Sequence, residues 1–262
     1  LAIREAKLSA VLTMVPDAVI LVDEEGTILD FSAAAERLWG YRAEQVVGEP
    51  VILLAPPSHA ERTRQELADL RERGVEALAI SALLARLGTA DAVEPVISLD
   101  TLVASVDFAR VGRAAARFSE DELAQLSART LHLLPYADVK ERLAGIDADL
   151  GEAFWLAVRG NLATLADAAG WAQVVRGPIA PVLEEPAFLA EAAGLLPADP
   201  WDETSWKAWT GAITTATGRK GRQLFHPLRL ALTAQEKGPE MAKLLPLIGR
   251  GRVEARLNGQ AA

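Results

Sequence analysis

The sequence predicts a multidomain, mainly α-helical protein in which a small α/β unit, made of two strands plus helices, precedes an all-α region. Two observations carry this prediction. Two short β-rich runs flank a polar turn within residues 18–31, and apolar side chains recur at helical spacing through most of the remaining chain. Half of the 262 residues are hydrophobic, which is enough to bury more than one core.

The first elements follow from local sequence signals. Residues 1–14 carry apolar side chains at a helical period and stop before Pro16, which predicts a helix. The run "AVILVDEEGTILDF" then predicts one strand over residues 18–22, a polar turn, and a second strand over residues 27–31. The expected product is a β-hairpin preceded by a helix.

Helix signals follow the second strand. Ser32 is a good N-cap and Gly40 a good C-terminal stop, so a helix is expected between them, and a charged helix is expected over residues 59–73. The only later stretch typical of a strand is residues 95–99. The sheet therefore keeps two strands, and the unpaired edge of the first strand favours either pairing with another chain, such as a second copy, or local disorder.

The remaining sequence is rich in Ala and Leu and is divided by short connectors that contain Gly and Pro, as in helical bundles. Helices are expected over residues 78–87, 120–134, 153–168, 186–195, 204–217, 227–233 and 239–250.

Composition excludes several classes of function. The 27 Lys and Arg residues are outnumbered by 36 Asp and Glu, giving a net charge of −9, so any nucleic-acid surface must be local. There is no cysteine, and no apolar run approaches the roughly 20 residues that span a bilayer. We expect a cytoplasmic protein with no membrane partner.

Motifs for catalysis are also missing. The three histidines, His59, His132 and His226, are far apart, and the sequence has no phosphate-binding G-x-x-x-x-G-K-[ST], no G-x-S-x-G and no H-E-x-x-H. We therefore expect no catalytic residue, no metal site and no cofactor.

One island of positive charge stands out. The stretch "TGRKGRQLFHPLRLALT", residues 217–233, contains no acid and four cations: Arg219, Lys220, Arg222 and Arg229. If Pro227 begins a helix, Arg229 falls in the first turn, where the helix dipole disfavours a cation by roughly 0.3–1 kcal/mol. This cost favours an external anion as the partner of the island.

The N-terminal stretch "VPDAVILVDEEGTILDFSAAAERLWGYRAEQVVGEPVILLAPPSHAER" resembles the first half of a PAS domain, with Ser32 in place of the common Asn. The resemblance covers about residues 8–66 and stops before the three further strands that a PAS domain has. Haem-binding PAS domains carry a His where Arg62 aligns, so no haem is expected.

The remaining sequence, residues about 68–262, resembles the C-terminal half of bacterial glutamyl-tRNA synthetase. The resemblance rests on "LRERGVEALAISALLARLGTADAVEP", "DFARVGRAAARFSEDELAQLSARTLHLLPY", "FWLAVRGNLATLADAAGWAQVV" and "PWDETSWKAWTGAITTATGRKGRQLFHPLRLALTAQEKGPEMAKLLPLIGR". Ser127 and Ala234 depart from the family pattern. The resemblance implies three domains: a truncated PAS-like segment (1–66), a helical stem-contact domain (67–130) and a helical anticodon-binding cage (131–262).

The resemblance implies that this half holds glutamate-accepting tRNA by its inner stem and its anticodon, and no DNA. The residues expected to contact the RNA are Arg159, Asn161, Arg219, Lys220, Arg222, Arg229, Lys237, Gly238, Pro239, Met241 and Arg250. The family's H-x-G-H and K-[ML]-S-K-[SR] motifs are absent from the sequence, so aminoacylation by this chain alone is not expected.

Three alternatives qualify these expectations. The tryptophans at 155, 171, 201, 206 and 209 could stack on bases, but their helical settings favour packing. The PAS-like segment could act as a sensor or dimerisation element that regulates the tRNA-binding part. The chain could also be a non-functional gene fusion joined at "ELADLRERG".

Overall fold

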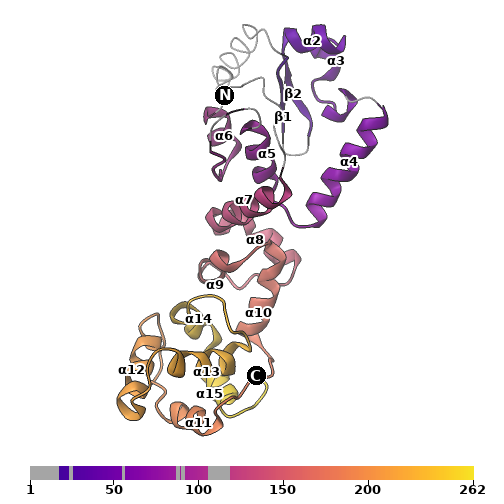
Figure 1. Cartoon of the computed structure of the whole chain (residues 1–262). Coiled ribbons are helices and arrows are strands. Elements are labelled where there is room, and N and C mark those ends of the chain that lie inside the picture. The colour runs from indigo at the N-terminus through magenta and orange to yellow at the C-terminus, as the bar shows by residue number, and fades with distance from the viewer. Residues whose placement is uncertain (1–17, 24–25, 55–56, 87–88, 90–91, 106–118) are drawn as a thin grey trace. The chain divides into compact units, whose positions relative to one another are not determined.

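The computed structural model describes residues 18–23, 26–54, 57–86, 89, 92–105 and 119–262 (Figure 1). For Ile52 and residues 57–64 it describes the backbone. The described chain is mainly helical with one two-stranded sheet near its start, which confirms the predicted fold class. The helix expected over residues 1–14 lies outside the described residues.

The chain divides into two compact units, Leu1–Ser81 and Ala82–Ala262. The division into three domains at residues 66 and 130 stays a prediction. No helix in the described ranges is long and apolar enough to cross a membrane.

The sheet of the first unit is an antiparallel hairpin of β1 (Ile20–Val22) and β2 (Ile28–Phe31). The Asp23 carboxylate accepts a hydrogen bond from the Thr27 N–H (2.7 Å), which closes the turn between the strands. On its other side β2 is paired as well, because the Ile28 N–H donates to the Glu49 carbonyl (2.9 Å). Pairing of the β1 edge with another chain stays a prediction.

The first helix of this unit, α2 (Ala33–Trp39), begins and ends as its predicted caps indicate, and the charged helix expected over residues 59–73 is α4 (Pro57–Glu72). The Ser32 hydroxyl accepts from the Ala35 N–H (3.2 Å), and Gly40 ends the helix with a φ of 77°. Between these two helices lie α3 (Ala43–Val46) and the 3-10 turn η1 (Val51–Leu54).

This first unit has a small core. Ile28, Phe31, Ala35 and Val46 are buried together, but Leu38 keeps 67% of its surface exposed. Residues 95–99 lie in the second unit and form no strand there. A two-stranded sheet of this size buries little apolar surface, which is expected if the segment is a truncated PAS-like domain.

The second unit is helical. Its elements, with α5 crossing the boundary between the units, are α5 (Ala77–Arg86), α6 (Leu99–Ser105), α7 (Glu120–Leu133), α8 (Tyr136–Gly145), α9 (Glu152–Val158), η3 (Arg159–Asn161), η4 (Leu165–Asp167), α10 (Ala168–Arg176), α11 (Pro186–Gly194), α12 (Ser205–Thr217), α13 (Arg222–Thr233), α14 (Met241–Ile248) and α15 (Arg250–Leu257).

Two of these helices organise the core of the second unit. α14 packs against α9, α10 and α12, and α15 packs against α11 and α13. Trp155 and Trp209 are almost completely buried, and their indole N–H groups donate to the carbonyls of Leu134 and Ala192 (2.9 Å each). The predicted packing role is confirmed for these two tryptophans, whereas Trp171, Trp201 and Trp206 are partly exposed.

Two predicted helices are broken in the structure. The helix expected over residues 153–168 stops at Val158, because the Asp167 carboxylate accepts from the Ala163 and Thr164 N–H groups (3.0 and 2.8 Å) and starts a new element there. The helix expected over residues 239–250 ends before Gly249, whose φ of 81° is left-handed, and α15 follows as a separate helix.

Candidate nucleic-acid interface

The cation island lies on a tight connection between two helices. Gly218 ends α12 with a φ of 73°, and Gly221, with a φ of 57°, is the N-cap of α13. The Leu224 and Phe225 N–H groups bond to the Gly221 carbonyl, so α13 begins at Arg222. The glycines allow this connection because both adopt positive φ angles.

The predicted start of this helix at Pro227 is therefore wrong. Pro227 lies inside α13, and Arg229 lies in its C-terminal half. Because Arg229 lies outside the first turn, where the helix dipole disfavours a cation, the electrostatic cost expected for Arg229 does not exist. The position of Arg229 in the helix therefore gives no indication of an external anion.

Because α13 starts at Arg222, four of its residues form a stripe along one face of the helix that the sequence did not predict. Arg222, Phe225, His226 and Arg229 follow the i, i+3, i+4, i+7 spacing and share one helix face, which is exposed or half-buried. Phe225 keeps 45% of its surface exposed, and its ring centroid lies 6.2 Å from that of Trp206. The spacing was visible in the sequence, but only for a helix that includes residues 222–226.

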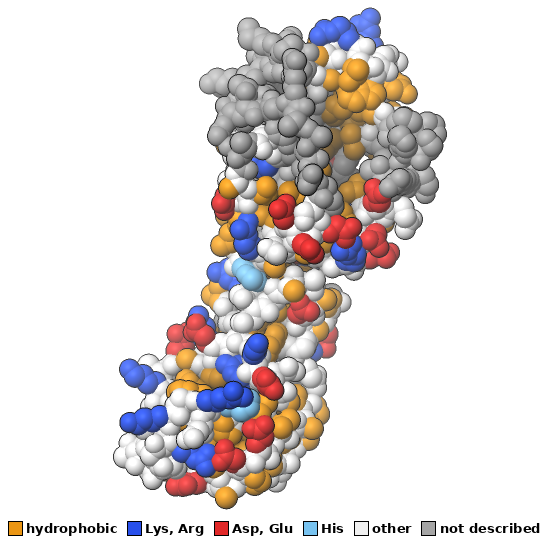
Figure 2. All heavy atoms as spheres, viewed as in Figure 1, with side chains coloured by type: hydrophobic (Ala, Val, Ile, Leu, Met, Phe, Trp, Pro, Cys, Tyr) orange, Lys and Arg blue, Asp and Glu red, His pale blue; other side chains and the backbone are white. Residues whose placement is uncertain are grey.

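Three of the predicted cations are free to meet an anion. The side chains of Lys220, Arg222 and Lys237 are exposed and make no hydrogen bond or ion pair with any residue that the structure describes. Asn161, at the end of η3, is exposed in the same way. Figure 2 shows Lys and Arg side chains gathered over the region of α12, α13 and α14, with acidic side chains nearby.

The other four predicted cations already have acceptors inside the chain. Each is an arginine whose guanidinium donates a hydrogen bond to a backbone carbonyl. The pairs are Arg159 to Leu134 (2.9 Å), Arg219 to Gln223 (3.4 Å), Arg229 to Pro239 (2.9 Å) and Arg250 to Pro197 (3.1 Å). These contacts fix loops and helix ends of the second unit.

The turn over residues 237–241 is held from two sides. Arg229 donates to the Pro239 carbonyl, and Gly238 lies so close to Trp171 that an added Cβ would come within 2.1 Å of the indole ring. Pro239 and Met241 are buried. The structure thus brings Arg229 and this turn together, whereas Arg159 and Arg250 bond elsewhere.

Arg229 is electrostatically unusual. Burial lowers the pKa of its guanidinium, although arginine remains a cation in proteins. Its Nη1 atom is buried without a hydrogen-bond partner among the described residues. Such an orphaned donor typically costs about 1–3 kcal/mol. The hydrogen bond to the Pro239 carbonyl therefore holds in place a guanidinium whose donors are not all paired among the described residues.

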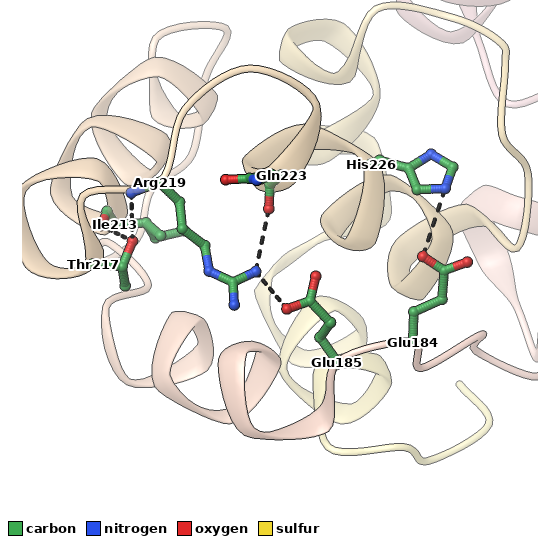
Figure 3. Close-up of polar contacts among 7 residues, drawn as sticks. All are labelled: Glu184, Glu185, Ile213, Thr217, Arg219, Gln223 and His226. Carbon is green, nitrogen blue, oxygen red and sulfur yellow. Dashed lines mark hydrogen bonds and ion pairs between the residues drawn. The ribbon is translucent and has the colours of Figure 1, made fainter.

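Two adjacent acids border the cation island. Glu185 forms an ion pair with Arg219 (2.6 Å), and Glu184 lies 3.6 Å from the His226 ring nitrogen (Figure 3). Both acids belong to the connector between α10 and α11. Among the described residues, no group of three or more His, Cys, Asp or Glu could hold a metal ion.

Comparison with known proteins shows what the two parts of the chain are similar to. Residues 149–261 match the family model of the anticodon binding domain, and residues 6–78 match that of the PAS fold. The chain is 54% identical over 199 residues to glutamate–tRNA ligase 1 of Parvibaculum lavamentivorans and 52% identical over 198 residues to glutamate–tRNA ligase 2 of Methylobacterium sp. (strain 4-46).

These relatives are longer than this chain. The matches cover 76% and 75% of the chain but 44% of each ligase, so the chain spans less than half the length of the curated relatives it matches. The crystal structure of a glutamate tRNA ligase from Elizabethkingia meningosepticum has the same fold over 72% of this chain and 41% of that chain, with a TM-score of 0.60 at 20% identity. The second unit is homologous to the C-terminal half of glutamate–tRNA ligases.

The close approach of Gly238 to Trp171 in the second unit leads to a stability prediction. The substitution Gly238→Ala should lower the free energy of unfolding by roughly 1–3 kcal/mol, because the new Cβ overlaps the indole and the φ of 152° disfavours a side chain. Urea unfolding followed by tryptophan fluorescence measures the change.

A matched control is Gly251→Ala. A Cβ at Gly251, inside α15, would meet nothing within 4 Å, so we expect a gain of about 0.5–1 kcal/mol from helix propensity. Equal effects of the two substitutions would show that Trp171 does not constrain the turn.

Proposed function

We propose that the C-terminal part of this chain binds a glutamate-accepting tRNA by its anticodon arm and inner stem, and that the chain does not aminoacylate this tRNA by itself. One observation carries the proposal. Lys220, Arg222 and Lys237 lie in the region that matches the anticodon-binding family, and their side chains are exposed and have no partner among the residues that the structure describes.

The chemistry of these side chains suits RNA. Binding of nucleic acid depends mainly on neutralising phosphates with Lys and Arg, and exposed rings stack on unpaired bases. The stripe on α13 offers both, because Phe225 is exposed between Arg222 and Arg229. Since the whole chain carries a net charge of −9, we expect attraction of RNA to be confined to this region.

The proposed lack of aminoacylation rests on the sequence. The motifs that the ligase family uses for ATP and adenylate formation are absent, and the stretch before residue 70 is PAS-like instead. The proposed role is therefore RNA binding without chemistry.

The test is a titration of fluorescently labelled tRNA with the full chain, followed by anisotropy. Glutamate-accepting tRNA should bind, and exchange of its anticodon bases should weaken binding by about tenfold or more, because each stacked or read base contributes about 1–3 kcal/mol. Equal affinity for both RNAs, or no binding of either at low salt, would overturn the proposal. In a parallel assay with ATP and labelled glutamate, transfer of glutamate to tRNA by the full chain would contradict the proposal that the chain does not aminoacylate tRNA by itself.

A further inference from the structure

Arg219 differs from its neighbours in the cation island because it points into the protein. Its Nη1 atom lies 2.6 Å from the Glu185 carboxylate (Figure 3). Its guanidinium carbon also lies 4.1 Å from the centroid of the Phe188 ring. The Arg219 side chain is 30% exposed, and the Phe188 ring beneath it is buried. A cation already paired with a carboxylate and stacked on a ring has little charge to offer a phosphate.

Pro227 gives Arg219 a specific task. Proline has no N–H, so inside α13 it cannot donate to the carbonyl four residues earlier, which belongs to Gln223. Arg219 Nη1 lies 3.4 Å from this carbonyl oxygen and donates to it (Figure 3). The long bond is weak, but it satisfies an acceptor that the helix itself leaves open.

The backbone of the connection is fixed at the same residue. The Arg219 N–H donates to the Thr217 hydroxyl (3.2 Å), which in turn donates to the Ile213 carbonyl (2.8 Å). Arg219 therefore ties the loop to α12, α11 and α13 at once. Lys220 and Arg222, on either side of Gly221, remain exposed and unpaired among the described residues.

We propose that Arg219 is a positioning residue for RNA binding: with Glu185, Phe188 and the Gln223 carbonyl it holds the loop so that Lys220 and Arg222 face the phosphates. It does not neutralise a phosphate itself. Fixing a loop in advance improves affinity because less conformational entropy is lost on binding. This inference rests on the proposed function, since it assigns roles within the same RNA surface.

Removal of Glu185 distinguishes the two roles by the sign of the effect. If Arg219 met a phosphate, Glu185→Ala would free a cation and raise the affinity of the full chain for glutamate-accepting tRNA. If Arg219 positions the loop, the same change lowers the affinity by roughly 2- to 10-fold, although the protein loses a negative charge. Glu191→Ala, an exposed acid on α11, removes the same charge without touching Arg219 and should leave the affinity unchanged or slightly higher.

Salt dependence gives a second readout. Loss of one phosphate contact lowers the slope of log affinity against log salt by about 0.7–0.9. We expect this decrease for Arg222→Ala, whereas Arg219→Ala should weaken binding with no change in slope. Pro227→Ala, which supplies an N–H for Gln223, should restore part of the affinity lost in Arg219→Ala.

The outcomes separate the inference from the proposed function. A higher affinity for Glu185→Ala, or a smaller salt slope for Arg219→Ala, would overturn the positioning role while leaving RNA binding intact. No binding by the unchanged chain would overturn the proposed function and this inference together. Circular dichroism of each variant shows whether it is folded, and the comparison of Glu185→Ala with Glu191→Ala does not depend on any change to the island itself.

Discussion

Replacement of Lys220, Arg222 and Lys237 together by alanine should abolish most of the salt-sensitive binding of tRNA by the full chain. The three side chains are exposed and have no partner among the described residues, so their removal should leave the fold unchanged. If each contacts one phosphate, the salt slope falls by about 2–2.7. When the salt concentration rises from about 50 mM to about 200 mM, the ratio of the tRNA affinity of the unchanged chain to that of the variant should fall by roughly 20- to 40-fold.

A control with one lost charge tests whether this effect is local. Lys140 is exposed on α8, outside the cation island, and Lys140→Ala should change the salt slope by much less than any single change within the set. Equal slopes for Lys140→Ala and Lys220→Ala would mean that tRNA responds to the overall charge of the protein and not to the proposed surface.

The sequence predicted these three cations, but it could not separate them from the arginines that bond within the chain. The sequence shows the same positive charge at each Lys and Arg. Whether a side chain stays exposed or bonds within the chain depends on which backbone carbonyls the fold leaves without a donor. Arg219 is an example, because its role depends on Pro227 lying inside a helix instead of at its start. An arginine can satisfy such carbonyls because its guanidinium has several donors on a long side chain.

The fold class and most helices were predictable, because apolar spacing and caps are local signals. The start of α13 was missed because proline is favoured in the first helical turn, and the sequence alone gives no reason to place it further inside. The break after Val158 was missed because it depends on the Asp167 carboxylate bonding to the backbone of residues 163 and 164. Such side-chain bonds compete with the helix and leave no periodic signal.

Replacement of Arg256 should have the largest effect on stability. Its side chain is completely buried in α15, and it donates to the Leu232 carbonyl at the end of α13 (2.7 Å) and to the Ala262 carbonyl (2.8 Å). Arg256→Ala leaves both acceptors without this donor and creates a cavity, so we expect the free energy of unfolding to fall by roughly 2–4 kcal/mol. Urea unfolding monitored by tryptophan fluorescence measures this loss.

The charge of Arg256 reduces its net benefit. Burial, with a smaller contribution from Arg252, lowers the pKa of Arg256 to about 10. Because the folded pKa lies below the ordinary value, the folded state binds this proton less tightly than the unfolded state does. The cost of burying this charge is therefore present at neutral pH, where the guanidinium is a cation.

Arg252→Ala is the matched control for Arg256→Ala. Arg252 is on the same helix but exposed, and among the described residues it donates only to the Ile248 carbonyl one turn earlier (3.3 Å). Its loss should change stability by less than about 0.5 kcal/mol. Similar losses for the two variants would show that Arg256 does not anchor the end of α13.

The most direct measurement is nuclease footprinting of end-labelled glutamate-accepting tRNA with and without the full chain. If the surface formed by α13 and the turn over residues 237–241 holds the anticodon arm, nucleotides of the anticodon loop and the adjoining inner stem are protected while the acceptor end is cut as before. An unchanged cleavage pattern at saturating protein, or protection restricted to the acceptor end, would contradict the account.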